Sequence, residues 1–166
     1  MVFDVVAKGF CLLVARLGLR NINLLLMGRL GQRLQFRLGL KTLAELAVGI
    51  QGTKEIAAEV SLVLPKPCGI DDFDLCVLFA NALDNAIAAC RANDGAKAIR
   101  ISGKQQGDFY MLTFENTCSD EPLPPAGTGL SNIKAVAEKY HGALLTEKNG
   151  RQYYLSVLLN ISPCNS

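Results

Sequence analysis

The chain has 166 residues, of which 50% are hydrophobic and 19% are charged, and its formal net charge is +2. This length and composition suit one domain, which could carry an appendage. The near-neutral charge argues neither for a nucleic acid nor for an acidic partner, and we expect no nucleic acid as partner. The six cysteines form no CxxC pair and have no neighbouring His, which argues against a disulfide framework or a zinc site and for reduced core cysteines of a cytosolic protein.

Residues 1–50 are apolar and basic, and we interpret them as a helical arm. Hydrophobic residues recur at helical spacing, and the only acids are Asp4 and Glu45. Charges interrupt every long apolar run, so we expect a soluble piece, which a larger membrane protein could still contain. Two interpretations of the basic face stay open: it binds an anionic surface, or it is solvated above a partner helix. The apolar face suits pairing with a second copy, and we expect a homodimer.

The segment before the central helix predicts one strand. Residues 52–58 are expected to extend a helix, and Glu59–Leu64 then alternates apolar and polar side chains as a strand does. Pro65 ends that strand, because proline lacks the N–H group that a sheet ladder needs.

Residues 71–92 form the helix around which we expect the domain to be built, because apolar side chains recur there at helical spacing. Asp71 or Asp72 suits the N-cap, and residues 93–95 offer a C-cap in the left-handed region. Opposite the apolar arc runs a polar stripe, made of Asp74, Asn81, Asp84 and Asn85. Short amide and carboxylate side chains are unfavourable inside helices, so this stripe is either a binding site or a solvated face.

The rest of the chain alternates hairpins with one more helix. In order we expect strand 97–102, turn 106–108, strand 109–116, loop 117–126, a helix opening at 127–133 and ending at Gly142, strand 143–146, turn 149–150 and strand 152–161. This order predicts an α+β fold, a two-layer sandwich in which the helices cover one face of a mixed, mostly antiparallel sheet.

Gly127-Thr-Gly-Leu130 at the start of the second helix is another candidate site. Glycines let the backbone approach an anion, and a helix N-terminus offers unpaired N–H groups and the positive end of the helix dipole. These features suit a phosphate group, although a plain loop-to-helix turn has the same sequence. The segment is no P-loop, because GxxxxGK[ST] is missing, and the polar loop before it does not fit a Rossmann turn.

Four segments agree in order and spacing with one known family, namely Asn81–Ala86 (NALDNA), Glu115-Asn116, Gly127–Ile133 (GTGLSNI) and Tyr140–Gly142. Together they resemble the ATP-binding domain of the sensor histidine kinases, within the GHKL (Bergerat-fold) superfamily, and above all its AgrC-type branch. The resemblance spans residues 55–161. It implies a Bergerat-type fold for residues 51–166, preceded by the arm 1–50, which would dimerise or link to a sensor region. It also implies a cytoplasmic location, including the cytosolic part of a membrane-bound sensor.

The resemblance implies ATP and Mg²⁺ as ligands of the polar stripe. Asn85 matches the family's metal-binding Asn, an oxygen donor that bridges Mg²⁺ and the phosphates. Asn81 lies one turn earlier, where related hydrolases carry a water-activating Glu; an amide cannot accept a proton, so efficient ATP hydrolysis is not expected. Asp84 would support the site or cap a backbone group.

The other site residues also follow from the resemblance. Glu115 or Asn116 would read the adenine amino group, and Thr117-Cys118 stand where the family has glycines. The phosphate cradle would consist of Gly127, Thr128, Gly129 and Leu130, while Asn132 either contacts phosphate or caps the helix. Pro125 replaces a further glycine. Tyr140 is expected in the core, and His141, the only histidine, is interpreted as a surface residue at the helix end rather than a phosphoacceptor.

The implied function is the catalytic domain of a two-component histidine kinase. It would position Mg-ATP for phosphoryl transfer to a histidine on another domain or chain, upstream of a response regulator. Two alternatives stay open. One is a GHKL-shaped interaction module with weak or lost nucleotide chemistry, and the other is an anti-sigma-type serine kinase.

Overall fold

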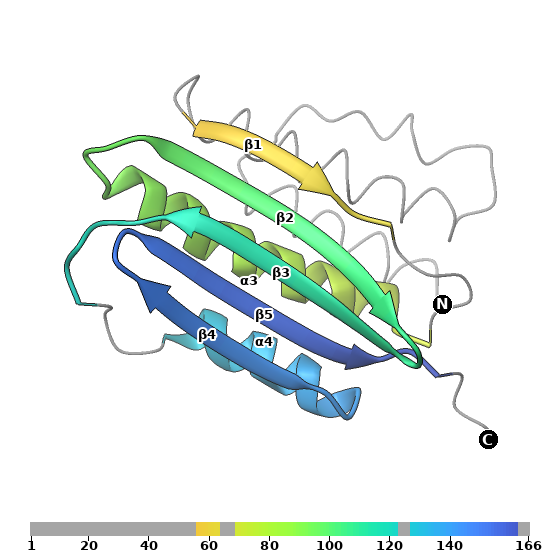
Figure 1. The fold of residues 1–166 in the computed structure, drawn as a ribbon. Helices are drawn as coiled ribbons and strands as arrows, with labels where there is room; N and C mark the ends of the chain where they lie inside the picture. The colour runs from red at the N-terminus through yellow and green to blue at the C-terminus, as the bar shows by residue number, and fades with distance from the viewer. Residues whose placement is uncertain (1–55, 64–68, 123–126, 163–166) are drawn as a thin grey trace, which may run out of the picture.

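The computed structural model describes residues 56–63, 69–122 and 127–162, and everything below concerns these residues (Figure 1). The expected arm 1–50, the stop at Pro65 and three of the cysteines (Cys11, Cys68 and Cys164) lie outside them.

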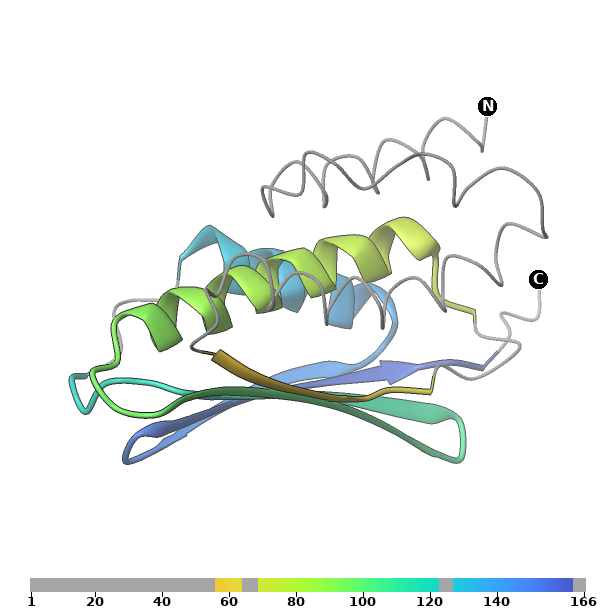
Figure 2. The same cartoon turned by 90° about the horizontal axis from the view of Figure 1, so that it is seen from above.

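Five strands and two helices make up the described part of the chain. They are β1 Ile56–Ser61, α3 Asp72–Arg91, β2 Lys97–Gln106, β3 Phe109–Thr117, α4 Thr128–Lys139, β4 Ala143–Asn149 and β5 Gln152–Asn160. The sheet order is β1-β2-β3-β5-β4, with β1 parallel to β2 and every other pair antiparallel. Both helices lie on the same face of this twisted sheet (Figure 2). The predicted α+β sandwich is therefore confirmed.

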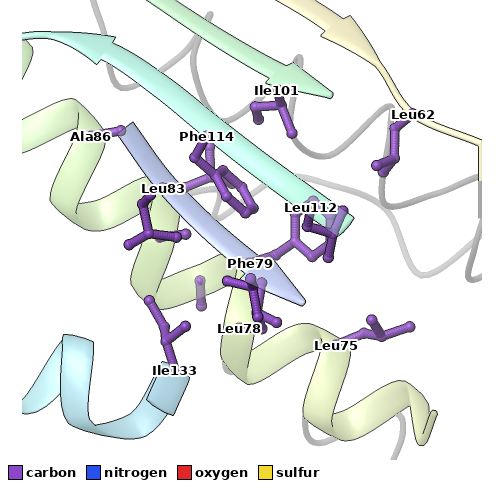
Figure 3. Packing of buried hydrophobic residues seen from close by; sticks show 14 of the residues in the cluster. Leu62, Leu75, Leu78, Phe79, Leu83, Ala86, Ile101, Leu112, Phe114 and Ile133 are labelled. Atoms are coloured by element: carbon purple, nitrogen blue, oxygen red, sulfur yellow. The ribbon is translucent and has the colours of Figure 1, made fainter. Parts of the chain in front are cut away.

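The core lies between the sheet and the helices. Leu75, Phe79 and Leu83 of α3 are at most 1% exposed and face the sheet, where Leu112 and Phe114 are equally buried (Figure 3). The rings of Phe79 and Phe114 meet edge to face at 5.3 Å, a geometry worth about 1 kcal/mol beyond the area it buries. The apolar arc predicted for α3 is thus the core face. Phe73–Arg91 of α3 is the one described segment long and apolar enough to cross a membrane, and here it packs as a core helix.

Two boundaries around the central helix differ from prediction. The expected helix at 52–58 is wrong for its described part, because Ile56 already belongs to β1, where it pairs with Lys97 of β2 and has a buried side chain. Asp71 is the N-cap, as one of the two predicted alternatives, and its carboxylate accepts from the N–H of Phe73 at 2.8 Å. The C-cap, Ala92, is right-handed. The next residue, Asn93, stabilises the turn after the helix, because its side chain donates to the carbonyl of Ala96.

The end of α4 also differs from the expected glycine cap. His141 has the left-handed conformation (φ 50°), and the N–H groups of His141 and Gly142 donate back to Glu138 and Ala137. This is a Schellman motif with His at the position that glycine usually takes. Gly142 is needed for another reason, because a Cβ there would lie 1.8 Å from the carbonyl oxygen of Leu158 in β5.

Both predicted hairpins are present. Their strands β2, β3 and β4 run further than predicted, and β5 ends one residue earlier, at Asn160. Gly107 opens the β2–β3 turn and Gly150 opens the β4–β5 turn, each with positive φ as a tight hairpin requires. The second turn consists of Gly150 and Arg151 rather than Asn149 and Gly150, because Asn149 pairs with Gln152.

Candidate functional site

The polar stripe of α3 faces α4 rather than solvent. Asp74 and Asn81 are buried, and Asp84 and Asn85 are half-buried. The alternative of a solvated face is therefore wrong for Asp74 and Asn81. The two helices run antiparallel to each other, so that the start of α4 lies beside the middle of α3 and its end lies beside the start of α3.

Gly129, the second residue of α4, brings the two helices together. A Cβ at this position would be 3.4 Å from the amide oxygen of Asn81 and 3.4 Å from both amide atoms of Asn85. The two Asn side chains lie one turn apart on α3, and both point towards the first turn of α4. The structure thus unites Asn81, Asn85 and Gly129, which the sequence places in two separate motifs.

Asn81 has an unsatisfied buried oxygen. The residue is 2% exposed, and its amide nitrogen donates to the carbonyl of Val77 at 2.7 Å. Its Oδ1 atom is buried and has no hydrogen-bond partner among the described residues. Such an orphan acceptor costs about 1–3 kcal/mol, so its presence calls for an explanation, such as a bound water or ligand.

The N-terminus of α4 has free hydrogen-bond donors. Gly127 is the N-cap, no side chain caps the helix and no acid lies in its first turn. A Cβ on Gly127 would meet no atom of the described residues within 4 Å. The first N–H groups and the helix dipole together favour an anion.

The other residues expected around this helix terminus divide into two groups. Thr128 is exposed in the first turn, while Leu130 is half-buried and packs against the core. Asn132 is exposed at the fifth helical position, so the alternative that it caps the helix is wrong. Only its possible phosphate contact stays a prediction.

The two candidates for base recognition lie on opposite faces of β3. Asn116 is on the helix-facing side with Phe114 and is 3% exposed, and its Nδ2 donates to the carbonyl of Thr117 at 3.0 Å. Glu115 is on the outer face, where it pairs with Arg100 at 3.5 Å. The strand therefore places Asn116, and not Glu115, on the side of the α3 amides. The alternation of the strand could have given this result, because Asn116 has the same parity as the core residues of β3.

At the end of β3, where the family has glycines, the side chain of Thr117 is held by two contacts. The hydroxyl of Thr117 accepts from the N–H of Ala98 at 3.1 Å and lies 3.5 Å from the thiol of Cys90. Burial raises the pKa of Cys90 above its usual value, and hydrogen bonds with Thr117 only partly oppose this. Cys76, Cys90 and Cys118 are all buried and reduced, as predicted.

A polar cluster at the far end of the two helices was not predicted. Asp74 accepts from the hydroxyl of Tyr140 (2.5 Å) and from the ammonium of Lys139 (2.6 Å), both at Oδ2. Burial and the bond to Asp74 raise the pKa of Tyr140 to about 12. Tyr140 contacts the core, as expected, but its hydroxyl is also engaged. No local signal in the sequence indicates this contact, because its partners are 66 residues apart.

Comparison with known proteins adds a family and a fold. The family model of the GHKL domain matches residues 70–160. The Acinetobacter baumannii histidine kinase AdeS superposes with a TM-score of 0.62 at 15% identity, over 75% of this chain and 64% of that one. The catalytic domain of histidine kinase ThkA gives 0.61 at 15% identity, over 79% and 94%. The Erythrobacter litoralis EL346 blue-light activated histidine kinase gives 0.66 at 12% identity, over 97% and 59%.

The structural matches and the family match show different things. At such identities the structural matches show a common fold, and the chain spans less than two thirds of the AdeS and EL346 structures. No curated protein matches the chain in sequence. The family match, by contrast, covers more than half of the chain, from just before α3 to the end of β5.

Proposed function

The chain belongs to the GHKL domain family, and we propose that it is the ATP-binding catalytic domain of a sensor histidine kinase. One observation carries the proposal: the orphan amide oxygen of Asn81 and the amide of Asn85 lie directly against Gly129, at a helix N-terminus that no side chain caps. Buried acceptors beside free N–H donors suit a ligand that brings both a cation and phosphate oxygens.

The residues fit Mg²⁺ with a nucleotide. Among the described residues no group of three His, Cys, Asp or Glu side chains could hold a metal, so a cation here would rely on amide and phosphate oxygens. Mg²⁺ accepts this arrangement, because it keeps several waters and often takes only one or two protein ligands alongside phosphates. We assign the metal contact to Asn85 and a contact to the metal's water shell to Asn81. When bound, Mg²⁺ would neutralise negative charge on the phosphates.

The phosphates would lie at the first turn of α4. The N–H groups that follow Gly127 would donate to the phosphate oxygens, and Gly129 leaves room for them beside Asn85. The base would extend towards the end of β3. There we assign the recognition of the adenine amino group to Asn116, because its Nδ2 is engaged by the carbonyl of Thr117 and its oxygen remains the acceptor.

Phosphoryl transfer would then depend on positioning and charge rather than on a base of this domain. Asn81 cannot take a proton from water, which favours transfer over hydrolysis. The receiving histidine would belong to another domain or chain. His141 is unsuitable, because it follows α4 at the end opposite Gly127, about 20 Å away along a helix that rises 1.5 Å per residue. A response regulator, a second copy of the chain and a cytoplasmic location are part of the same proposal.

Calorimetric titration with ADP and with a non-hydrolysable ATP analogue, with and without Mg²⁺, tests the proposal. We expect binding in the micromolar to sub-millimolar range that Mg²⁺ strengthens. Absence of binding at millimolar ligand, with a folded protein shown by circular dichroism, would overturn it.

One observation favours an interaction module as the second candidate. The outer face of the sheet, which neither helix covers, carries exposed apolar side chains: Phe109 and Met111 on β3 and Leu145 on β4. Thr117 and Cys118 also stand where the family has glycines, and this departure favours weak nucleotide binding. Binding of a partner protein without any nucleotide effect on stability would support this candidate.

A further inference from the structure

The contacts that polar side chains of α3 make with α4 fall into two groups, one at each end of the helix pair. At one end Gly129 lies against Asn81 and Asn85, and at the other end Tyr140 lies against Asp74. Gly129 and Tyr140 are 11 residues apart, or about 16 Å along the helix axis. The cluster at the far end therefore does not touch a ligand bound beside Gly129.

The contacts between the two ends are apolar. Ile133, Val136 and Ala137 are buried on the inner side of α4 (Ile133 is drawn in Figure 3). Apolar packing is not directional and depends mainly on the area that is covered. Such contacts hold α4 on the domain but restrain its sliding along α3 less sharply than hydrogen bonds of fixed length and angle do.

The cluster at the far end is directional and partly shielded from water. The Asp74 side chain is 13% exposed, and one of its oxygens accepts from both Tyr140 and Lys139. The Tyr140 hydroxyl also accepts from the backbone N–H of Asp71 at 2.9 Å, so a single hydroxyl joins the N-cap of α3 to its first turn and to the end of α4. Hydrogen bonds to a charged group are stronger than neutral ones, and this pair fixes the position of α4 along α3.

We propose that Tyr140 and Asp74 are positioning residues for the nucleotide site, because they set the distance between the phosphate-binding turn of α4 and the metal-binding Asn85 of α3. This inference rests on the proposed function. A cation held by Asn85 and phosphates held by α4 can share oxygen ligands only if the two helices keep one register. A shift of about 1 Å would already disturb hydrogen-bond and metal-ligand distances.

The test separates positioning from stability through the effect of Mg²⁺. Partial unfolding reduces the apparent affinity for nucleotide by the same factor with and without Mg²⁺, because only the folded fraction binds. The ratio of the two dissociation constants for ADP, without and with Mg²⁺, is therefore insensitive to folding. A displaced α4 lowers this ratio, since Mg²⁺ no longer bridges the two helices.

The variants are Tyr140→Phe and Asp74→Ala, with Asp74→Asn as the conservative change that keeps an acceptor oxygen for Tyr140. Tyr110→Phe is the matched control, because it removes a buried tyrosine hydroxyl that donates at 2.8 Å to the carbonyl of Val63, a residue outside both helices. In the full chain, we expect Tyr140→Phe and Asp74→Ala to lower the Mg²⁺ ratio for ADP at least fivefold. Asp74→Asn and Tyr110→Phe should stay within about twofold of the wild type.

An unchanged ratio in Tyr140→Phe would overturn the inference and leave the proposed function intact, whereas a wild type that binds no ADP would overturn the proposed function. Amide NMR spectra of the ligand-free proteins decide the inference in either case. Tyr140→Phe should shift the resonances of Gly129 and of the Asn85 side chain, and Tyr110→Phe should not. Unshifted resonances in Tyr140→Phe would contradict a positioning role.

Discussion

Gly129 lies against Asn85, so that a methyl group on the glycine would contact both atoms of the amide at 3.4 Å. This distance is ordinary van der Waals contact, and the variant Gly129→Ala should therefore fold. Ala also favours a helix by about 1 kcal/mol over Gly, so the free energy of unfolding should not fall. The methyl group would nevertheless occupy the space beside Asn85, and we expect Mg-ADP affinity to decrease about tenfold.

Gly127→Ala is the control for that experiment. A Cβ at Gly127 would meet no atom of the described part of the chain within 4 Å. Calorimetry with Mg-ADP should show a smaller loss for Gly127→Ala than for Gly129→Ala. The reverse order of the two affinities would place the phosphates elsewhere.

Removal of the Asn85 amide should abolish the effect of Mg²⁺ without unfolding the domain. Asn85 is half-buried against α4, so truncation of its side chain should cost the fold about 1 kcal/mol, which leaves the domain folded. For Asn85→Ala we expect the dissociation constant of ADP to become the same with and without Mg²⁺. Asn85→Asp retains an oxygen ligand and should retain part of the Mg²⁺ effect. If Asn85→Ala keeps a wild-type response to Mg²⁺, the metal assignment is wrong.

Substitution of Asn81 by Leu should make the fold more stable and the binding of Mg-ADP weaker. Its buried Oδ1 atom has no partner, and the side chain of Leu fills a similar volume without a polar atom. We expect Asn81→Leu to raise the free energy of unfolding by about 1 kcal/mol, measured in urea, and to reduce Mg-ADP affinity at least tenfold. A destabilised variant with normal affinity would show that the orphan oxygen belongs to the fold and not to a site.

Stability should decrease at alkaline pH, in part through Tyr140. Its pKa is about 12 in the folded protein and about 10 in an unfolded chain, so the folded state binds the phenolic proton more tightly. This contribution is fully present below pH 10 and is lost as the pH rises to about 12. The pKa of Lys139 is also raised, chiefly by its hydrogen bond with Asp74, and acts in the same direction.

Urea unfolding between pH 9 and 11.5 checks this pH dependence. Tyr140→Phe should lose stability less steeply with pH than the wild type. Tyr153 and Cys90, whose pKa values are raised by burial, remain in both proteins and cancel in the comparison. Identical slopes would mean that Tyr140 titrates normally.

The end of α4 offers a pair of neighbouring substitutions with opposite signs. His141 has a left-handed backbone that costs a non-glycine residue about 1 kcal/mol, so His141→Gly should raise stability by about 0.5 kcal/mol. Gly142→Ala would push a methyl group into the carbonyl of Leu158 and should lower stability by about 3 kcal/mol. Thermal and urea unfolding of both variants measure the difference. Equal effects would contradict the close approach of α4 and β5.

Local patterns predicted most of the secondary structure. The helix expected at 71–92 spans Asp72–Arg91, and both hairpins occur with their glycine turns, because helical periodicity, alternation and turn residues act over a few neighbours. The helix expected at 52–58 is a strand in its described part, since pairing of Ile56 with β2 decides its conformation and that contact is 41 residues away.

The sequence predicted the site residues in separate motifs, and the fold shows which of these residues lie close together. Asn81, Asn85 and Gly129 come together because α4 packs antiparallel on α3, a tertiary fact that no single motif contains. Glu115 was an equal candidate with Asn116, and only the orientation of β3 separates them. The bond between Asp74 and Tyr140 was missed, because a carboxylate in a polar stripe gives no sign of the distant hydroxyl that it binds.

The parallel pair of β1 and β2 affects how force enters the domain. Among the described strands, β1 lies at an edge and pairs with β2 alone, whereas β2, β3 and β5 each have two neighbours. The polypeptide that precedes Ile56 is joined directly to this edge. A pull on that segment would load the shortest ladder first, and detachment of β1 would leave the four antiparallel strands joined to one another. Loss of β1 would therefore leave the pairing of β3 with β2 and β5 intact.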